Sequence, residues 1–171
     1  DSWRIFATMN TYDKTSLYEM SYAFMRRFAF IRVPAPEFTT GDDDTARTEL
    51  TTEMNAYIDA WDGLGPSDEE RDAIGQVWKQ TNQAVDDRSI GPAIVRDMLT
   101  YVTNRRTTVA DDLSERVTEA VISYIFPQLE GVPERKQIIT HIAAVGATDT
   151  DTLRTAASDM LQVTIDTETE S

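Results

Sequence analysis

The sequence predicts a mainly α-helical protein in which two short strands near the N-terminus are followed by about six helices. Two apolar runs, Trp3–Met9 and Phe28–Val33, are short and end at polar residues or proline, as strands of a buried parallel sheet do. Beyond residue 44 the apolar residues recur every three or four positions, which is the period of an amphipathic helix. This change of period divides the 171 residues into a short strand-bearing part and a longer helical part.

The N-terminal part contains one further element between its two strands. The segment Ser16–Phe24 fits a short helix, because its first residues form a capping box. Pro34 and Pro36 end the second strand, since proline has no backbone N–H to donate to a sheet. The polar, glycine-containing segment Thr39–Asp44 then predicts a hinge.

Six helical segments are expected after this hinge. The second has the clearest start, because Ser67 and Glu70 form the S-x-x-E pattern of a capping box. Pro92 suits the first turn of the third helix, and Pro127 ends or kinks the fourth. The positions that define the six segments are, in order, Leu50, Met54, Tyr57, Ile58 and Trp61; Ile74, Val77, Trp78, Thr81 and Val85; Ile94, Met98, Tyr101 and Val102; Leu113, Val117, Val121, Tyr124 and Ile125; Pro133–Val145; and Thr152–Val163.

The charge balance is strongly acidic, with a net charge of −14 from 30 acidic and 16 basic residues. The acids form clusters such as Asp42–Asp44 and Asp68–Glu70, and lysine occurs only at positions 14, 79 and 136. This composition is typical of a cytosolic protein from a halophilic archaeon, although an ordinary acidic protein is the alternative. Because phosphate binding needs clustered Lys and Arg, the lack of a basic stripe argues against direct nucleic-acid binding.

Other classes of site and location are also constrained by the composition. The chain has no cysteine, which excludes disulfides and cysteine-based metal sites. It has no apolar run of about 18 residues and no signal-peptide pattern at its start, so we expect a cytoplasmic protein without a membrane span. His141 stands alone among apolar residues, which favours a core or boundary role, and no metal site is predicted.

The N-terminal part carries a recognisable pattern. An apolar run ends in Thr8-Met9-Asn10-Thr11, and two arginines, Arg26-Arg27, stand directly before the second run at Phe28. This layout resembles the sensor 1 strand, connecting helix, arginine finger and last core strand of an AAA+ NTPase of the MoxR/McrB type. The resemblance is specific over residues 4–36 and moderate over the helical part, where residues 121–131 resemble archaeal McrB-like ATPases.

The resemblance implies roles for three residues. Asn10 would orient the attacking water as sensor 1, and Arg27, or as second choice Arg26, would be the finger that neutralises transition-state charge from a neighbouring subunit. The alternatives are a turn asparagine bonded to its own backbone and a pair of surface arginines bonded to local acids. The helical part would be the lid, which in this family carries a nucleotide-binding sensor 2 arginine. Ala93 stands where the family usually has this arginine, and Arg88 and Arg96 are the candidate substitutes.

The family layout implies two regions, residues 1–38 as the C-terminal end of the α/β core and 39–163 as the helical lid. The charged, threonine-rich residues 164–171, which the resemblance does not cover, predict a flexible tail. No P-loop string G-x-x-x-x-G-K-[ST] occurs, and no Walker B strand precedes Asn10. We therefore expect the natural protein to extend upstream of Asp1, where the motifs for ATP and Mg²⁺ would lie.

The implied function is an ATPase that forms a homo-oligomeric ring, a hexamer in the expected form, and remodels a macromolecular partner. The present chain alone should then be inactive. The alternative is a non-enzymatic helical module that binds a protein partner and adds its N-terminal strands to the partner's sheet.

Overall fold

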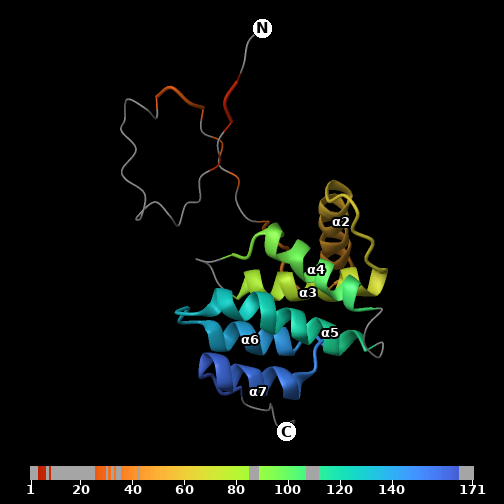
Figure 1. The fold of residues 1–171 in the computed structure, drawn as a ribbon, viewed down its shortest axis with the longest axis vertical. Helices are drawn as coiled ribbons and strands as arrows, with labels where there is room; N and C mark the ends of the chain where they lie inside the picture. The colour runs from red at the N-terminus through yellow and green to blue at the C-terminus, as the bar shows by residue number, and fades with distance from the viewer. Residues whose placement is uncertain are drawn as a thin grey trace. The chain divides into compact units, whose positions relative to one another are not determined.

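The computed structural model describes residues 4–6, 8, 26–29, 31, 33, 36–41, 43–84, 89–106 and 112–165. The chain divides into two compact units, residues 1–34 and residues 35–171. In the second unit, drawn in Figure 1, the described helices are α2 (Asp44–Ala60), α3 (Asp68–Gln83), α4 (Pro92–Arg105), α5 (Leu113–Ala120), the π-helix η2 (Val121–Ile125), the 3-10 helix η3 (Phe126–Leu129), α6 (Arg135–Ala143) and α7 (Thr150–Leu161). The mainly α-helical class is thus confirmed.

The first unit shows no strand in its described residues. Residues 4–6, 8, 31 and 33, which belong to the two predicted strands, have no regular secondary structure, and Arg26–Ala29 forms a turn. A strand needs a neighbour to receive its backbone hydrogen bonds, and a pair of short strands alone is marginal in water. The two-strand prediction is therefore not met by these residues, and the helix predicted at Ser16–Phe24 lies outside the described residues.

Helix α3 is the centre of the second unit. It packs against α2, α4, α5 and α6, while α7 closes the unit against α6 and η3 (Figure 1). Its residues Ile74, Val77 and Trp78 are fully buried in a single apolar core that takes residues from every helix after α2 as well. Gly75 allows α2 to approach closely, because a β-carbon there would lie 3.2 Å from Cγ of Met54.

Side-chain caps fix where the helices begin. The predicted capping box is confirmed: Glu70 N donates to Ser67 Oγ at 3.2 Å, and Ser67 N donates to Glu70 Oε2 at 2.9 Å. Three aspartates that were not predicted as caps accept a backbone N–H at the starts of α2, α5 and α7; these are Asp43, Asp112 and Asp149. Acidic residues thus stabilise helix starts by accepting backbone hydrogen bonds, and their charge also complements the helix dipole.

The fourth predicted helix changes its geometry before Pro127. Helix α5 widens into the π-turn η2, in which Phe126 N–H bonds the carbonyl of Val121, five residues back, and the 3-10 turn η3 follows. Pro127 has no N–H for the carbonyl of Ser123, so an ordinary α-helix cannot continue through it. The widened turn keeps Val121, Ile125 and Phe126 buried across this break.

Parts of two segments that were predicted as a hinge and a tail, at 39–44 and 164–171, are held by hydrogen bonds. The predicted hinge at 39–44 is tied down, because Asp43 caps α2 and side chains of α3 bond the carbonyls of Phe38, Thr39 and Gly41. Of the predicted tail, residues 164–171, the structure describes Thr164 and Ile165; Ile165 is buried, and its carbonyl accepts a hydrogen bond from Arg154 Nε at 3.2 Å. Thr39, Gly41 and Ile165 are thus held through their backbone carbonyls.

Candidate functional site

Two of the five predicted site residues lie outside the described part of the chain. These are Asn10, the proposed sensor 1, and Arg88, one of the two sensor 2 substitutes. Arg26 and Arg27 are described in the first unit, and Arg96 is described in the second.

Arg26 and Arg27 occupy the exposed turn that precedes the second apolar run. Neither guanidinium forms an ion pair with any residue in the described ranges. The alternative of two surface arginines bonded to local acids therefore finds no partner in the described part of the chain.

Arg96 lies in the second turn of α4 and is exposed. Its backbone carbonyl accepts a hydrogen bond from Thr100 Oγ1 at 2.7 Å, and its guanidinium has no partner among the described residues. Pro92 starts this helix, as predicted. An exposed arginine near the start of a helix is chemically suited to bind a phosphate, but no other anion-binding side chain is described beside it.

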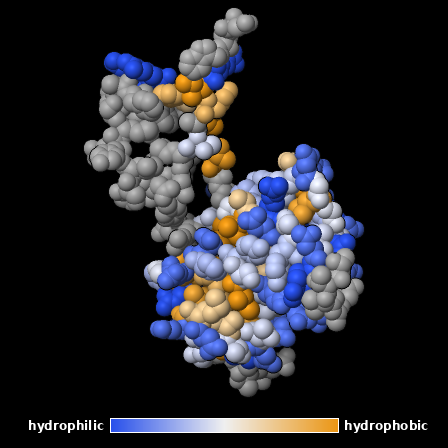
Figure 2. All heavy atoms as spheres, in the orientation of Figure 1, coloured by the Kyte–Doolittle hydropathy of each residue, from blue (hydrophilic) through white to orange (hydrophobic). Residues whose placement is uncertain are grey.

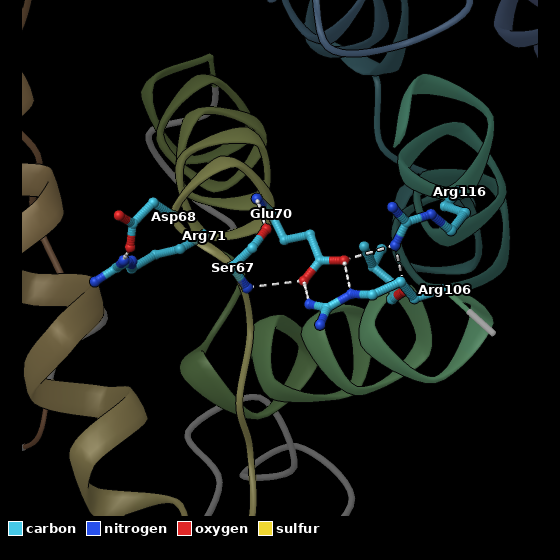
Figure 3. A network of polar contacts seen from close by, with 7 residues as sticks. Ser67, Asp68, Glu70, Arg71, Arg106 and Arg116 are labelled. Carbon is cyan, nitrogen blue, oxygen red and sulfur yellow. Dashed lines mark hydrogen bonds and ion pairs between the residues drawn. The ribbon is translucent and has the colours of Figure 1, made fainter. Parts of the chain in front are cut away.

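The most buried ion-pair cluster of the described residues was not predicted from the sequence. It centres on the carboxylate of Glu70, which lies between α3, α4 and α5 (Figure 3). Arg116 Nη1 donates to Glu70 Oε1 at 2.6 Å and to the carbonyl of Val102 at 2.7 Å. Arg106 Nε donates to Oε1 at 3.1 Å, and its Nη2 bonds Oε2. One carboxylate therefore joins three helices while completing the capping box of α3.

Burial and charge have opposite effects on Glu70. Its side chain is only 2% exposed, and this desolvation by itself raises the pKa of the carboxyl. Hydrogen bonds from Arg106 and Arg116, together with the backbone N–H of Ser67, outweigh that effect and lower the pKa to about 2. Glu70 is therefore ionised at neutral pH, and its oxygens are occupied by the protein. This arrangement serves stability, because no acceptor is left for a substrate proton.

A second polar cluster lies nearer the surface between α4 and α5. Arg105 Nη2 contacts both oxygens of Glu119, at 2.7 and 2.9 Å, and Tyr101 donates its hydroxyl proton to Glu119 Oε2 at 2.9 Å. The ring of Tyr101 also meets Tyr124 of η2 edge to face. Burial and the carboxylate of Glu119 raise the pKa of Tyr101, so its hydroxyl stays protonated and donating.

The described surface offers little that would hold a small molecule or a metal. A partly open hollow of about 410 Å³ between α2 and α3 is lined by Leu50, Thr51, Met54, Asp68, Arg71 and Asp72. Its arginine is already bonded to Asn55 and Asp68. The described residues contain no cluster of three or more potential metal ligands, and His141 is a half-buried residue of α6. None of the helices in the described ranges has the length and apolar character needed to cross a bilayer.

Comparison of the chain with family models, with curated proteins and with solved structures finds no match in any of the three.

Proposed function

We propose that this chain is the C-terminal part of a MoxR/McrB-like AAA+ ATPase that couples ATP hydrolysis to the remodelling of a macromolecular partner. The observation that carries the proposal is the pattern Thr8-Met9-Asn10 followed by Arg26-Arg27-Phe28. In such an enzyme Asn10 orients the attacking water, and Arg27 reaches the terminal phosphate in the neighbouring subunit of a ring.

The free state of the arginine pair supports this assignment. A trans-acting finger has to be exposed and unpaired in its own subunit, because its partner is the phosphate bound by the next one. Arg26 and Arg27 are exposed and have no ion pair with the described residues. Arg96 is similarly exposed and remains the described candidate for sensor 2.

The apolar residues beside the arginines give a second line of support. Phe6, Ile31 and Val33 are 89%, 86% and 87% exposed, respectively, although they lie in runs that read as buried strands. Figure 2 shows hydrophobic residues at the surface of this unit. Such residues are expected to be covered in the working protein, and strands of an AAA+ core, supplied from upstream of Asp1 together with the ATP and Mg²⁺ motifs, would cover them.

The test of the proposal is a mixing experiment with the intact protein. Arg27→Ala should leave nucleotide binding unchanged and lower turnover by roughly 10²-fold or more, because the transition-state charge loses its cation. Asn10→Ala should also lower turnover. When the two inactive variants are mixed, some interfaces combine an intact pocket with an intact finger, so phosphate release should partly return.

Two results would overturn the proposal. Mixed rings that form but recover no activity would exclude a trans role for Arg27. A gene whose upstream sequence lacks a P-loop would favour the alternative of a helical interaction module without enzymatic activity.

Arg96→Ala, tested in parallel, should weaken nucleotide binding if Arg96 is sensor 2.

A further inference from the structure

Residues 38–41, here called the connector, precede α2 within the second unit and are bonded to α3 through their backbone carbonyls. Gln83 Nε2 of α3 donates to the carbonyls of Phe38 and Thr39, at 3.4 and 3.0 Å, and Lys79 Nζ donates to the carbonyl of Gly41. Lys79 and Gln83 are four residues apart and therefore share one face of the helix. Three of the four carbonyls of residues 38–41 are thus held by two side chains.

Lys79 is unusual because a lysine is almost never fully buried. It is 1% exposed, and the carbonyl of Gly41 is one of its acceptors. A buried ammonium is stable only where its donors are satisfied, and the bond to Gly41 ties this buried group to the connector. Gly41 has φ +96°, a conformation that favours glycine, and the backbone bends at this residue.

The connector is also packed by an aromatic contact. The ring of Phe38 meets the ring of Trp78 edge to face, with centroids 4.9 Å apart. Trp78 Nε1 and Asn82 Nδ2, which lie next to Lys79 and Gln83 in the sequence, both donate to the carbonyl of Ile90, at 2.7 and 3.1 Å. Neighbouring pairs on α3 thus hold the chain that enters α2 and the chain that enters α4.

We propose that Phe38–Gly41 is a strap, held by Lys79 and Gln83, that moves as part of the helical unit. A displacement of the chain N-terminal to Phe38 is then delivered directly to α3, the central helix of the core, instead of being absorbed in a loose linker. This inference does not depend on nucleotide hydrolysis, and its test measures the attachment of the strap alone.

The test is limited proteolysis of the whole chain by chymotrypsin, which cuts after phenylalanine in accessible, extended backbone. Cleavage after Phe38 requires the strap to open, and its rate follows the open population when opening is fast. Cleavage after Phe28 in the exposed turn is the internal reference. Lys79→Met and Gln83→Leu each remove donors to the strap, so the ratio of Phe38 to Phe28 cleavage should rise by about tenfold.

Lys136→Met is the matched control, since it removes one lysine charge from an exposed position of α6 and should leave the ratio unchanged. Thermal melting verifies that each variant is folded. Folded Lys79→Met and Gln83→Leu proteins with the wild-type ratio would overturn the proposal, as would a wild-type chain already cut equally fast at both sites.

A second measurement needs no substitution in α3. Because the chain has no cysteine, Thr40→Cys introduces one exposed thiol in the strap. A nitroxide spin label attached to this thiol reports the motion of the strap. Its spectrum should show restricted motion in buffer and free motion in denaturant. Identical spectra in the two conditions would show that the strap is not held, even if both α3 variants failed to fold.

Discussion

At the scale of single residues, Glu70 is the side chain with the most consequences. It closes the capping box of α3 and forms ion pairs with two arginines that are 36 and 46 positions further along the sequence. Arg116 is almost completely buried, whereas Arg106 is partly exposed. Loss of the Glu70–Arg116 pair should therefore destabilise the fold more than loss of the Glu70–Arg106 pair. Removing one partner of a buried pair is strongly destabilising, because the other charge stays desolvated.

Glu70 should make the protein sensitive to acid. Its pKa falls from an ordinary 4.5 to about 2 in the folded chain, so its stabilisation is complete above the unfolded value and is lost as pH falls toward 2. The loss amounts to roughly 3 kcal/mol of unfolding free energy. Denaturant titrations between about pH 6 and pH 2 should show Glu70→Gln losing less stability than wild type over this window.

The neighbouring Glu69 supplies the control for this titration. It is exposed and lies outside the cluster, so Glu69→Gln should show the wild-type acid loss. If Glu70→Gln lost as much unfolding free energy at low pH as wild type, the ionised carboxylate would not stabilise the folded state.

At the scale of elements, the start of α3 is the feature that sequence and structure agree on most closely. Ser67→Ala removes the acceptor for Glu70 N–H and should lower the unfolding free energy by about 1 kcal/mol. Urea denaturation measures this change. Ser158→Ala, an exposed serine within α7, should be neutral or slightly stabilising because alanine favours helix. Equal effects of the two substitutions would contradict the capping role.

The helices were predictable because each signal that defines them is local. Apolar spacing located the six α-helices of the described residues, and Pro92 and the Ser67–Glu70 pattern placed two starts. The π-turn before Pro127 was foreseen only as an end or a kink, because its register depends on which side chains the core accepts. Aspartate caps were missed since an aspartate on an acidic surface carries no distinct pattern.

The polar clusters could not be predicted by the same reasoning. Arg106 and Arg116 resemble any other arginines in the sequence, and their joint contact with Glu70 appears only when α3, α4 and α5 are packed. The burial of Lys79 likewise could not be read from its position in the sequence. Of the site residues taken from the family resemblance, Arg26, Arg27 and Arg96 are described as exposed, and their proposed roles stay predictions.

At the scale of the whole molecule, charge is distributed unevenly along the chain. Residues 1–34 hold five basic and three acidic residues, and residues 35–171 hold 11 and 27, which gives net charges of +2 and −16. The helical unit therefore carries all of the net negative charge. Figure 2 shows its visible face as mostly hydrophilic, with smaller hydrophobic areas. Repulsion among its carboxylates opposes compaction, and dissolved salt screens that repulsion.

Salt should therefore stabilise the fold. The melting temperature is expected to rise between about 0.1 and 2 M KCl, because the screening length falls below the spacing of surface charges. Sodium chloride at equal ionic strength should act similarly if screening is the cause. A melting temperature that does not rise would remove the halophilic interpretation, since self-repulsion would then not limit stability.

The ties between residues 38–41 and α3 also decide where the molecule can be divided. The polar residues 39–44 suggest a natural cutting point, but a version shortened to begin at Asp43 would lose Phe38 and uncover the indole ring of Trp78. It would also leave the ammonium of Lys79 without one of its acceptors. An independently expressed helical unit should therefore keep the residues from Pro36 onward, even though these look like linker in the sequence.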